Sequence, residues 1–296
     1  MKRMLTYLLL CVLCIPSYGG TKRALVVCVG DYPSESGWNT LASQNDKALV
    51  LDLLDRCGFP SSNVVCLTET EATYAAIVKA LEELATVSRP GDQIYIHFSC
   101  HGQQITDQNG DEALRDPKDR YDEALIPYDA SVAYNWNGYR GEHHLIDDTL
   151  NDYLARIRKA IGSQGTILLV ADACHSGDIS RENIDPSLPP FRGALDAFDQ
   201  PYRGSTRKPV TQPSSWISIS ACKSFQTNFE VEIDGRRYGR LTYAISRCLK
   251  PGMSAGELVS ALDACFRQLP MPLGKSQSPL FEMPDNLKKH ILFDGR

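Results

Sequence analysis

The sequence of 296 residues lacks the marks of several protein classes. It has no long basic tract, and its formal net charge of −5 argues against a nucleic-acid binder, which needs clustered Lys and Arg. No internal repeat and no clean linker between domains is present. After residue 19, no apolar run reaches the ~20 residues that a membrane-spanning helix needs. What remains is ordinary for a globular protein, with 43% hydrophobic and 23% charged residues.

The first 19 residues differ from the rest of the chain. Two basic residues precede an apolar run that ends at Ile15, and small residues follow up to Gly19. This order is typical of a secretory signal peptide, and the alternative is a buried N-terminal strand. We therefore expect residues 1–19 to be removed, a secreted or periplasmic protein, and one folded domain over residues 20–296.

Cysteine is plentiful, but its pattern fits neither a disulfide framework nor a zinc site. Most of the cysteines after residue 19 lie in apolar runs, where Cys behaves as a small hydrophobe. We expect few or no disulfides, with Cys57 and Cys66 as the least unfavourable pair. Two Cys-His dipeptides raise the question of zinc. The C-x₂-C spacing is missing, however, and adjacent strand residues face opposite sides.

Apolar runs that indicate buried strands alternate with segments of helical period. The expected strands are 23–30, 63–67, 92–99, 166–172, 215–221 and 290–293. The expected helices are 46–57, 72–87, a helix from Thr149 or Asn151 to Ile161, 241–249 and 255–269. This alternation predicts an α/β fold, a mostly parallel sheet with helices on both faces. Two long stretches, about 103–145 and 178–214, fit no element.

Two short cassettes end the third and fourth expected strands. They are Phe98-Ser99-Cys100-His101-Gly102 and Asp172-Ala173-Cys174-His175-Ser176-Gly177. Sites in parallel sheets gather at the carboxyl ends of strands, so the fold can bring the two cassettes together. Cys174 is then the candidate nucleophile and His101 its base, with the backbone N–H groups of Gly102 and Cys174 facing a developing oxyanion. Residue types alone also allow an ordinary buried Cys and His.

Asp172 is informative because it lies two residues before Cys174 and faces the same way in an extended chain. A carboxylate beside the sulfur disfavours the thiolate, so activation explains Asp172 poorly. Recognition of an Arg or Lys side chain of a substrate explains it better. Asp46 offers a second carboxylate for this purpose, although its spacing alone fits a helix cap better.

The cassettes resemble those of the metacaspases, the caspase-like cysteine peptidases, here of a secreted bacterial type. The likeness extends to Gln44-Asn45-Asp46, Tyr121-Asp122-Glu123-Ala124, Ile146-Asp147-Asp148 and Ser218-Ile219-Ser220-Ala221-Cys222 followed by Gln226. It implies a caspase-type three-layer sandwich around a six-stranded, mostly parallel sheet. It also implies that Cys174 and His101 form the catalytic dyad, and that Asp46, Ser99 and Asp172 form the pocket for Arg or Lys before the scissile bond.

The resemblance further implies calcium, a hard ion that prefers oxygen ligands. Asp122, Asp147 and Asp148 match three of the family's calcium carboxylates. The fourth position holds Arg181, for which Asp178 is the nearest substitute. The alternative is a solvated acidic loop and a protein that needs no cofactor.

The sequence therefore predicts a monomeric cysteine endopeptidase that cleaves peptide or protein substrates after Arg or Lys. Two alternatives remain: a catalytically idle caspase-fold protein that acts as a binding or scaffold module, and a cysteine-dependent transpeptidase. Basic residues in the stretch 178–214 are expected to be exposed, which makes them candidate self-cleavage sites; these are Arg181, Arg192, Arg203, Arg207 and Lys208.

Overall fold

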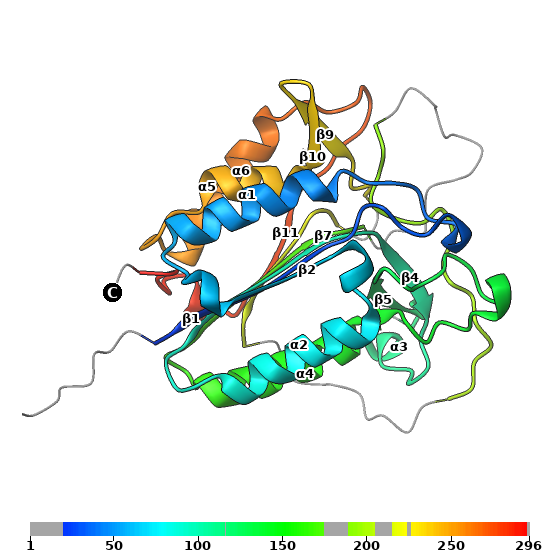
Figure 1. Ribbon diagram of the computed structural model, residues 1–296, viewed down its shortest axis with the longest axis horizontal. Coiled ribbons are helices and arrows are strands. Elements are labelled where there is room, and N and C mark those ends of the chain that lie inside the picture. The colour runs from blue at the N-terminus through cyan, green and yellow to red at the C-terminus, as the bar shows by residue number, and fades with distance from the viewer. Residues whose placement is uncertain (1–19, 116, 175–188, 205–214, 224–225, 295–296) are drawn as a thin grey trace, which may run out of the picture.

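The computed structural model describes residues 20–115, 117–174, 189–204, 215–223 and 226–294. Its centre is a six-stranded sheet with the strand order β11-β8-β7-β3-β1-β2 (Figure 1). The strands are β1 (Lys22–Cys28), β2 (Val64–Thr68), β3 (Gln93–Ser99), β7 (Thr166–Asp172), β8 (Ile217–Ser220) and β11 (Leu280–Glu282). All neighbours pair in parallel except β11, which is antiparallel to β8. The mostly parallel six-stranded sheet predicted from the sequence is confirmed.

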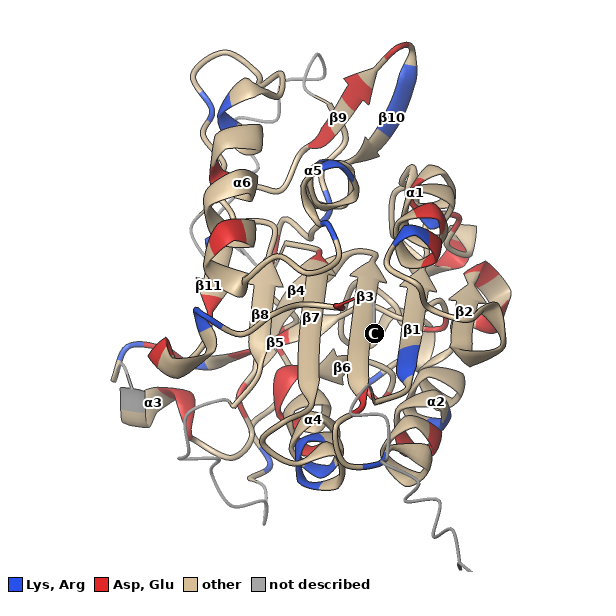
Figure 2. Ribbon diagram, turned by 90° about the vertical axis from the view of Figure 1, so that its left-hand side faces the viewer, with Lys and Arg blue, Asp and Glu red and all other residues tan. Residues whose placement is uncertain are grey.

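Helices cover both faces of this sheet (Figure 1). Two lie on one face, α2 (Tyr74–Val87) and α4 (Asp147–Ile161), and three lie on the other, α1 (Ser43–Arg56), α5 (Arg240–Cys248) and α6 (Ala255–Gln268). Two apolar cores result, one on each side of the sheet. Because both faces are covered, β3 and β7 are buried along their whole length and read as continuous apolar runs. Figure 2 shows few charged residues on the central strands and many on the helices.

The helix ends follow local chemistry. The side chain of Thr73 caps α2, and Ser254 with Glu257 forms a capping box on α6. The predicted start of the fourth helix at Thr149 or Asn151 is wrong, since α4 begins at Asp147. Two aspartates then occupy its first turn, where negative charge favours a helix N-terminus.

The predicted sixth strand is also wrong. The sixth strand of the sheet is β11, whereas residues 290–293 contribute Leu292 and Phe293 to the core and form a single bridge from Ile291 to Ser254. Burial alone explains the apolar character of 290–293, without pairing in the sheet.

The stretch 103–145 is not structureless. It holds most of a three-stranded antiparallel sheet, β4 (Gly102–Thr106), β5 (Tyr121–Leu125) and β6 (Leu145–Ile146), and the short helix α3 (Glu112–Arg115). A separate hairpin pairs β9 (Glu230–Ile233) with β10 (Arg236–Gly239) through an Asp-Gly turn, in which both residues have positive φ. Short 3₁₀ turns lie at Ser34–Ser36, Ser61–Asn63, Glu69–Glu71, Trp136–Gly138 and Asp285–Leu287.

The sequence also gave expectations about a signal peptide, membrane spans and disulfides. Residues 1–19, the predicted signal peptide, lie outside the described residues. None of the described helices has the length and apolarity needed to cross a bilayer. None of the eight cysteines of the described part is in a disulfide, Cys57 and Cys66 included.

Candidate active site

The two cassettes meet at the carboxyl ends of β3 and β7. These strands are neighbours in the sheet, with Ser99 paired to Asp172 in the register. His101 and Cys174 each lie two residues beyond that pair. The fold therefore places the candidate base and nucleophile at equivalent points on adjacent strand ends, as the sequence predicts.

His101 is buried and neutral. Burial lowers its pKa to about 4, and its ring stacks on Trp38 with centroids 4.8 Å apart. Its Nε2 lies 2.8 Å from the carbonyl oxygen of Asn39. A carbonyl only accepts hydrogen bonds, so Nε2 carries the proton and Nδ1 holds a free lone pair. Nδ1 is buried with no hydrogen-bond partner among the described residues, which suits a proton acceptor.

Cys174 is fully buried, and its Sγ donates to the carbonyl oxygen of Gln226 at 3.2 Å. A second thiol, Cys222, is next to it. A hydrogen bond that Cys222 shares with Cys174, and burial, both raise the pKa of Cys222. Cys222 is therefore held as a neutral thiol and offers no competing thiolate.

Arg192 fills the acidic pocket beside these residues. Its Nη2 donates to Asp46 Oδ2 at 2.7 Å and to Glu230 Oε1 at 3.0 Å. Its Nη1 donates to Ser99 Oγ at 2.7 Å and to the carbonyl oxygen of Asp172 at 3.4 Å. The expectation that Arg192 is exposed is wrong, because its side chain is completely buried. Buried charges need such partners, since an unpaired one costs several kcal/mol.

The pocket keeps the guanidinium charged. Burial alone would lower the pKa of Arg192, but the surrounding carboxylates outweigh burial and raise it. Burial in turn raises the pKa of Asp46 to about 6, against the attraction of Arg192. The helix-cap interpretation of Asp46 is wrong: Ala42 precedes α1, and Asp46 instead accepts from Gly239 N and Ser99 Oγ.

The carboxylate of Asp172 supports the pocket through hydrogen bonds to residues other than Arg192. Its Oδ1 accepts from Asn228 at 2.8 Å, and its Oδ2 accepts from the backbone N–H and the hydroxyl of Thr242, both at 2.7 Å. Its charge acts on Arg192 through space. Gly239 packs directly against this carboxylate, and a side chain there would clash, because a Cβ would lie 2.2 Å from Asp172 Oδ2.

The main chain of Arg192 is held as firmly as its side chain. Its carbonyl oxygen accepts from the backbone N–H of Cys174 at 2.7 Å and from that of Gly102 at 3.3 Å. These are the two N–H groups that the sequence assigned to an oxyanion. The structure thus brings the predicted pocket residues, Cys174 and both oxyanion donors around one arginine, and His101 lies at the neighbouring strand end.

Sequence reasoning missed Glu230, Asn228 and Thr242. Glu230 begins β9, and the Asp-Gly turn after it was a hairpin signal in the sequence. That signal predicts the hairpin but not its position over the ends of β3 and β7. No local pattern marks Asn228 or Thr242 as pocket residues.

Of the other candidate self-cleavage residues, the structure describes only Arg203. Arg203 is exposed, and its backbone N–H donates to Gln108 Oε1 at 2.8 Å. Arg181, Arg207 and Lys208 lie outside the described residues.

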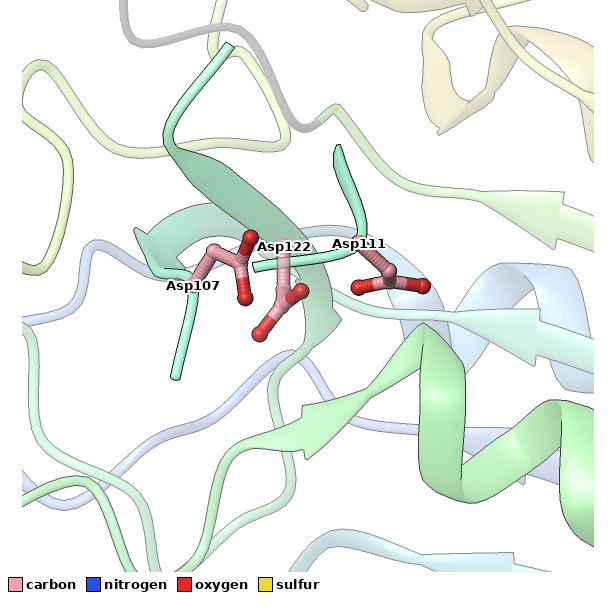
Figure 3. Close-up of side chains that lie close together, drawn as sticks. All are labelled: Asp107, Asp111 and Asp122. Carbon is pink, nitrogen blue, oxygen red and sulfur yellow. The ribbon is translucent and has the colours of Figure 1, made fainter. Parts of the chain in front are cut away.

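A cluster of buried carboxylates forms a second feature. Asp107, Asp111 and Asp122 have ligand oxygens that all lie within 4.8 Å of one another (Figure 3). Burial and the charges of nearby aspartates, Asp147 and Asp148 included, raise the pKa of Asp122 to about 8. Of the predicted trio only Asp122 belongs to this cluster, Asp147 and Asp148 act on it through their charges, and sequence reasoning missed Asp107 and Asp111. Their Asp-x-Asn-x-Asp spacing, 107 to 111, is a calcium-loop signal that was present in the sequence. Arg181 and Asp178 lie outside the described residues.

The sheet order, the helical layers and the two strand ends define a caspase-like α/β protein. A model of the caspase domain matches residues 21–291, and the chain belongs to this family. Metacaspase-1 of Cryptococcus neoformans is 26% identical over 280 residues, which cover 80% of this chain and 54% of that protein. Metacaspase-2 of Arabidopsis thaliana is 27% identical over 272 residues, covering 86% and 58%. The chain thus spans little more than half the length of these relatives.

Solved structures show the same fold. Caspase-1 of Spodoptera frugiperda superposes with a TM-score of 0.59 at 13% identity, over 94% of this chain and 93% of that one. A protein of Geobacter sulfurreducens gives a TM-score of 0.64 at 23% identity, over 93% and 98%. The predicted caspase-type fold and the likeness to metacaspases are confirmed.

Proposed function

We propose that this protein is a cysteine endopeptidase that cleaves peptide and protein substrates after Arg or Lys, with Cys174 as nucleophile and His101 as base. The observation that carries the proposal is the position of Arg192. One basic residue places its side chain in an acidic pocket and its carbonyl oxygen on the N–H groups of Cys174 and Gly102. A substrate residue needs the same two placements.

The pocket favours Arg over Lys. Two terminal nitrogens of Arg192 together reach Asp46, Glu230, Ser99 Oγ and the carbonyl oxygen of Asp172. A Lys ammonium is a single point charge on a shorter donor group and leaves part of this ring of acceptors without a partner. Acidic residues before the scissile bond meet only like charge here.

The proposed reaction has two stages. Cys174 passes its proton to Nδ1 of His101, and the thiolate attacks the carbonyl carbon of the basic residue. The two backbone N–H groups stabilise the oxyanion, a contribution of about 10²–10³ in rate per donor. His101 then protonates the departing amine, and water hydrolyses the thioester. The same residues also permit transfer to a second peptide, which product masses distinguish from hydrolysis.

Fluorogenic peptides that end in Arg, Lys or Asp test the proposal. We expect the largest kcat/KM for Arg, about tenfold less for Lys, and no detectable cleavage after Asp. Cleavage after Asp, or equal rates for all three peptides, would contradict this account of the pocket. A folded protein inactive towards all three, even after its own processing has gone to completion, would favour the idle scaffold.

The pH dependence of cleavage follows from Asp46. Burial raises its pKa to about 6, so the carboxylate that pairs with the substrate cation is charged above that pH and neutral below it. We expect kcat/KM for an Arg peptide to fall about tenfold per unit as the pH drops below about 6. His101 stays neutral in this range because burial lowers its pKa to about 4. In Asp46→Asn the fall of kcat/KM near pH 6 should disappear. A fall that persists at this pH would show that another group titrates there.

We also propose that the acidic cluster binds Ca²⁺. Two buried oxygens, Asp111 Oδ1 and Asp147 Oδ1, have no hydrogen-bond partner among the described residues and could bind a cation. The neighbouring carboxylates also repel one another around Asp122, which a cation would relieve. Asp107, Asp111 and Asp122 would hold the ion, whose positive charge would offset the repulsion that raises the pKa of Asp122. Asp122 pairs with Ile105 on β4, the strand that begins at Gly102. An ion bound to Asp122 would therefore also stabilise the strand that carries the backbone N–H of Gly102, one of the two oxyanion donors.

Calcium should therefore raise the unfolding temperature of the protein, and a chelator should lower both this temperature and the rate of cleavage. Asp122→Asn should abolish the thermal shift, whereas Asp55→Asn, a change at an exposed aspartate of α1, should preserve it. Differential scanning fluorimetry measures the shift. A shift of equal size in Asp122→Asn would place the ion elsewhere.

A further inference from the structure

His97 is a buried histidine that the proposed reaction does not use. It lies on β3 two residues before Ser99, so its side chain is on the same face of the sheet as this pocket residue. Its Nδ1 lies 2.9 Å from the hydroxyl of Tyr95, and its Nε2 lies 3.1 Å from Oγ1 of Thr242, in the first turn of α5. All the side chains in this row are buried, so their polar atoms need partners within the protein.

The hydrogen bonds of Thr242 fix the direction of this row. Oδ2 of Asp172 accepts from the hydroxyl of Thr242 and from its backbone N–H, both at 2.7 Å. A hydroxyl has a single proton, so Oγ1 of Thr242 donates it to Asp172 and accepts from Nε2 of His97. Burial lowers the pKa of His97 to about 4, which keeps the ring neutral with one proton, here on Nε2. Nδ1 of His97 therefore accepts from the hydroxyl of Tyr95.

The hydrogen bonds thus run one way, from Tyr95 through His97 and Thr242 to Asp172. In the other tautomer of His97 the proton would be on Nδ1 and Nε2 would be the acceptor. The hydroxyl of Thr242 would then turn from Asp172 to His97. Asp172 would keep its hydrogen bonds from Asn228 and from the backbone N–H of Thr242, but it would lose the hydroxyl donor.

The orientation of this hydroxyl matters for the acidic pocket. Against the effect of burial, the charges of Asp46 and then of Asp172 raise the pKa of Arg192, so Asp172 attracts the guanidinium. The carboxylate of Asp172 is completely buried, and hydrogen bonds from the protein replace its lost contacts with water. Each donor to Asp172 therefore affects how strongly the pocket holds a basic residue.

We propose that His97 is a positioning residue for recognition of the basic substrate residue, because it turns the hydroxyl of Thr242 towards Asp172 and so holds that carboxylate beside the pocket. The inference rests on the proposed function and adds a layer of residues behind the pocket. His97 acts on the pocket and not on the dyad, since Tyr95 and Thr242 occupy both of its ring nitrogens. It should therefore affect the binding of a basic residue more than the chemical step.

Two peptides that differ only in charge test the inference. One has Arg before the scissile bond, and the other has citrulline, a neutral isostere of Arg. We expect His97→Leu to lower kcat/KM for the Arg peptide about tenfold, mainly through KM, and to change that for the citrulline peptide by less than about twofold. His97→Gln keeps an amide N–H that can donate to Thr242, so it should recover most of the loss.

Thr242→Val tests the same hydrogen bond from its other end. It removes the hydroxyl and keeps the backbone N–H that donates to Asp172, so its loss should match that of His97→Leu. The double variant should lose no more than either single one, because both changes remove one and the same donor to Asp172. Should His97→Leu fail to fold, Thr242→Val alone provides the comparison of the two peptides.

His144→Leu is the matched control. His144 is buried between the hydroxyl of Tyr139, 2.8 Å from its Nδ1, and Oε1 of Gln103, 2.9 Å from its Nε2. Its partners resemble those of His97, but its row ends on an amide and not on a pocket carboxylate. We expect this variant to keep the wild-type ratio of kcat/KM for the Arg and citrulline peptides to within about twofold.

The same ratio decides the inference. A wild-type ratio in His97→Leu or in Thr242→Val would overturn it, whatever the absolute rates. A His97→Gln variant as impaired as His97→Leu would also overturn it, because the packing of the ring and not its Nε2 proton would then matter. Wild-type protein that cleaves neither peptide would instead contradict the proposed function.

Discussion

Cys174→Ala abolishes cleavage of Arg peptides, with a loss of about 10⁴-fold or more in kcat. The variant removes the sulfur that is hydrogen-bonded to the carbonyl of Gln226 and lies next to Cys222. It leaves the pocket and both oxyanion donors intact. His101→Ala should lose a similar factor, and the double variant should lose no more than either single one, because the two residues act as one unit. Steady-state kinetics on processed protein measures the three rates.

The matched control for this prediction is Cys222→Ala. It removes a buried thiol of the same kind next to Cys174, and we expect it to retain at least a tenth of the wild-type rate. Activity that survives in Cys174→Ala but disappears in Cys222→Ala would make Cys222 the nucleophile.

Glu230→Gln lowers kcat/KM for Arg peptides by about 10²-fold, and Asp46→Asn by at least as much. Each removes one of the two carboxylates that pair directly with the buried guanidinium, at 3.0 Å and 2.7 Å. Loss of one partner of a buried charge pair costs about 2–5 kcal/mol. The loss should fall mainly on substrates with a basic residue, so kcat/KM is compared between Arg peptides and matched neutral ones.

Glu232→Gln controls for the loss of a negative charge on the same strand. Glu232 is two residues from Glu230 on β9 but exposed, so the substitution should change kcat/KM by less than about twofold. Equal effects of the two glutamate variants would show that long-range charge, and not direct contact, governs recognition of the basic residue.

The sequence predicted the centre of the fold because the centre depends on local signals. β7 has the bounds expected from its apolar run, and β3 differs by one residue, since helices cover both faces of these strands. β4 and β5 were missed because they are short and largely polar, and β6 because it has only two residues. Contacts between separate segments set the pairing of all three strands.

The candidate site divides in the same way. Ser99 and Asp172 end β3 and β7, and His101 and Cys174 come two residues later. All four could be found from their positions at or just beyond strand ends. Glu230 acts only because its hairpin folds over those ends, which no pattern around it reveals. Arg192 was misread for a physical reason: Arg is almost always exposed unless it is paired. Its partners come from α1 and β9, far away in the sequence.

The most direct test of the account is covalent labelling with a peptide that ends in Arg and carries a thiol-reactive group after it. The protein is first incubated until its own fragments stop accumulating. We predict one adduct per molecule, on Cys174 by peptide mapping, with none from the matching Asp probe and none in Cys174→Ala. Labelling on another cysteine, or equal labelling by the Arg and Asp probes, would contradict the claim that Cys174 and the acidic pocket form one peptidase site.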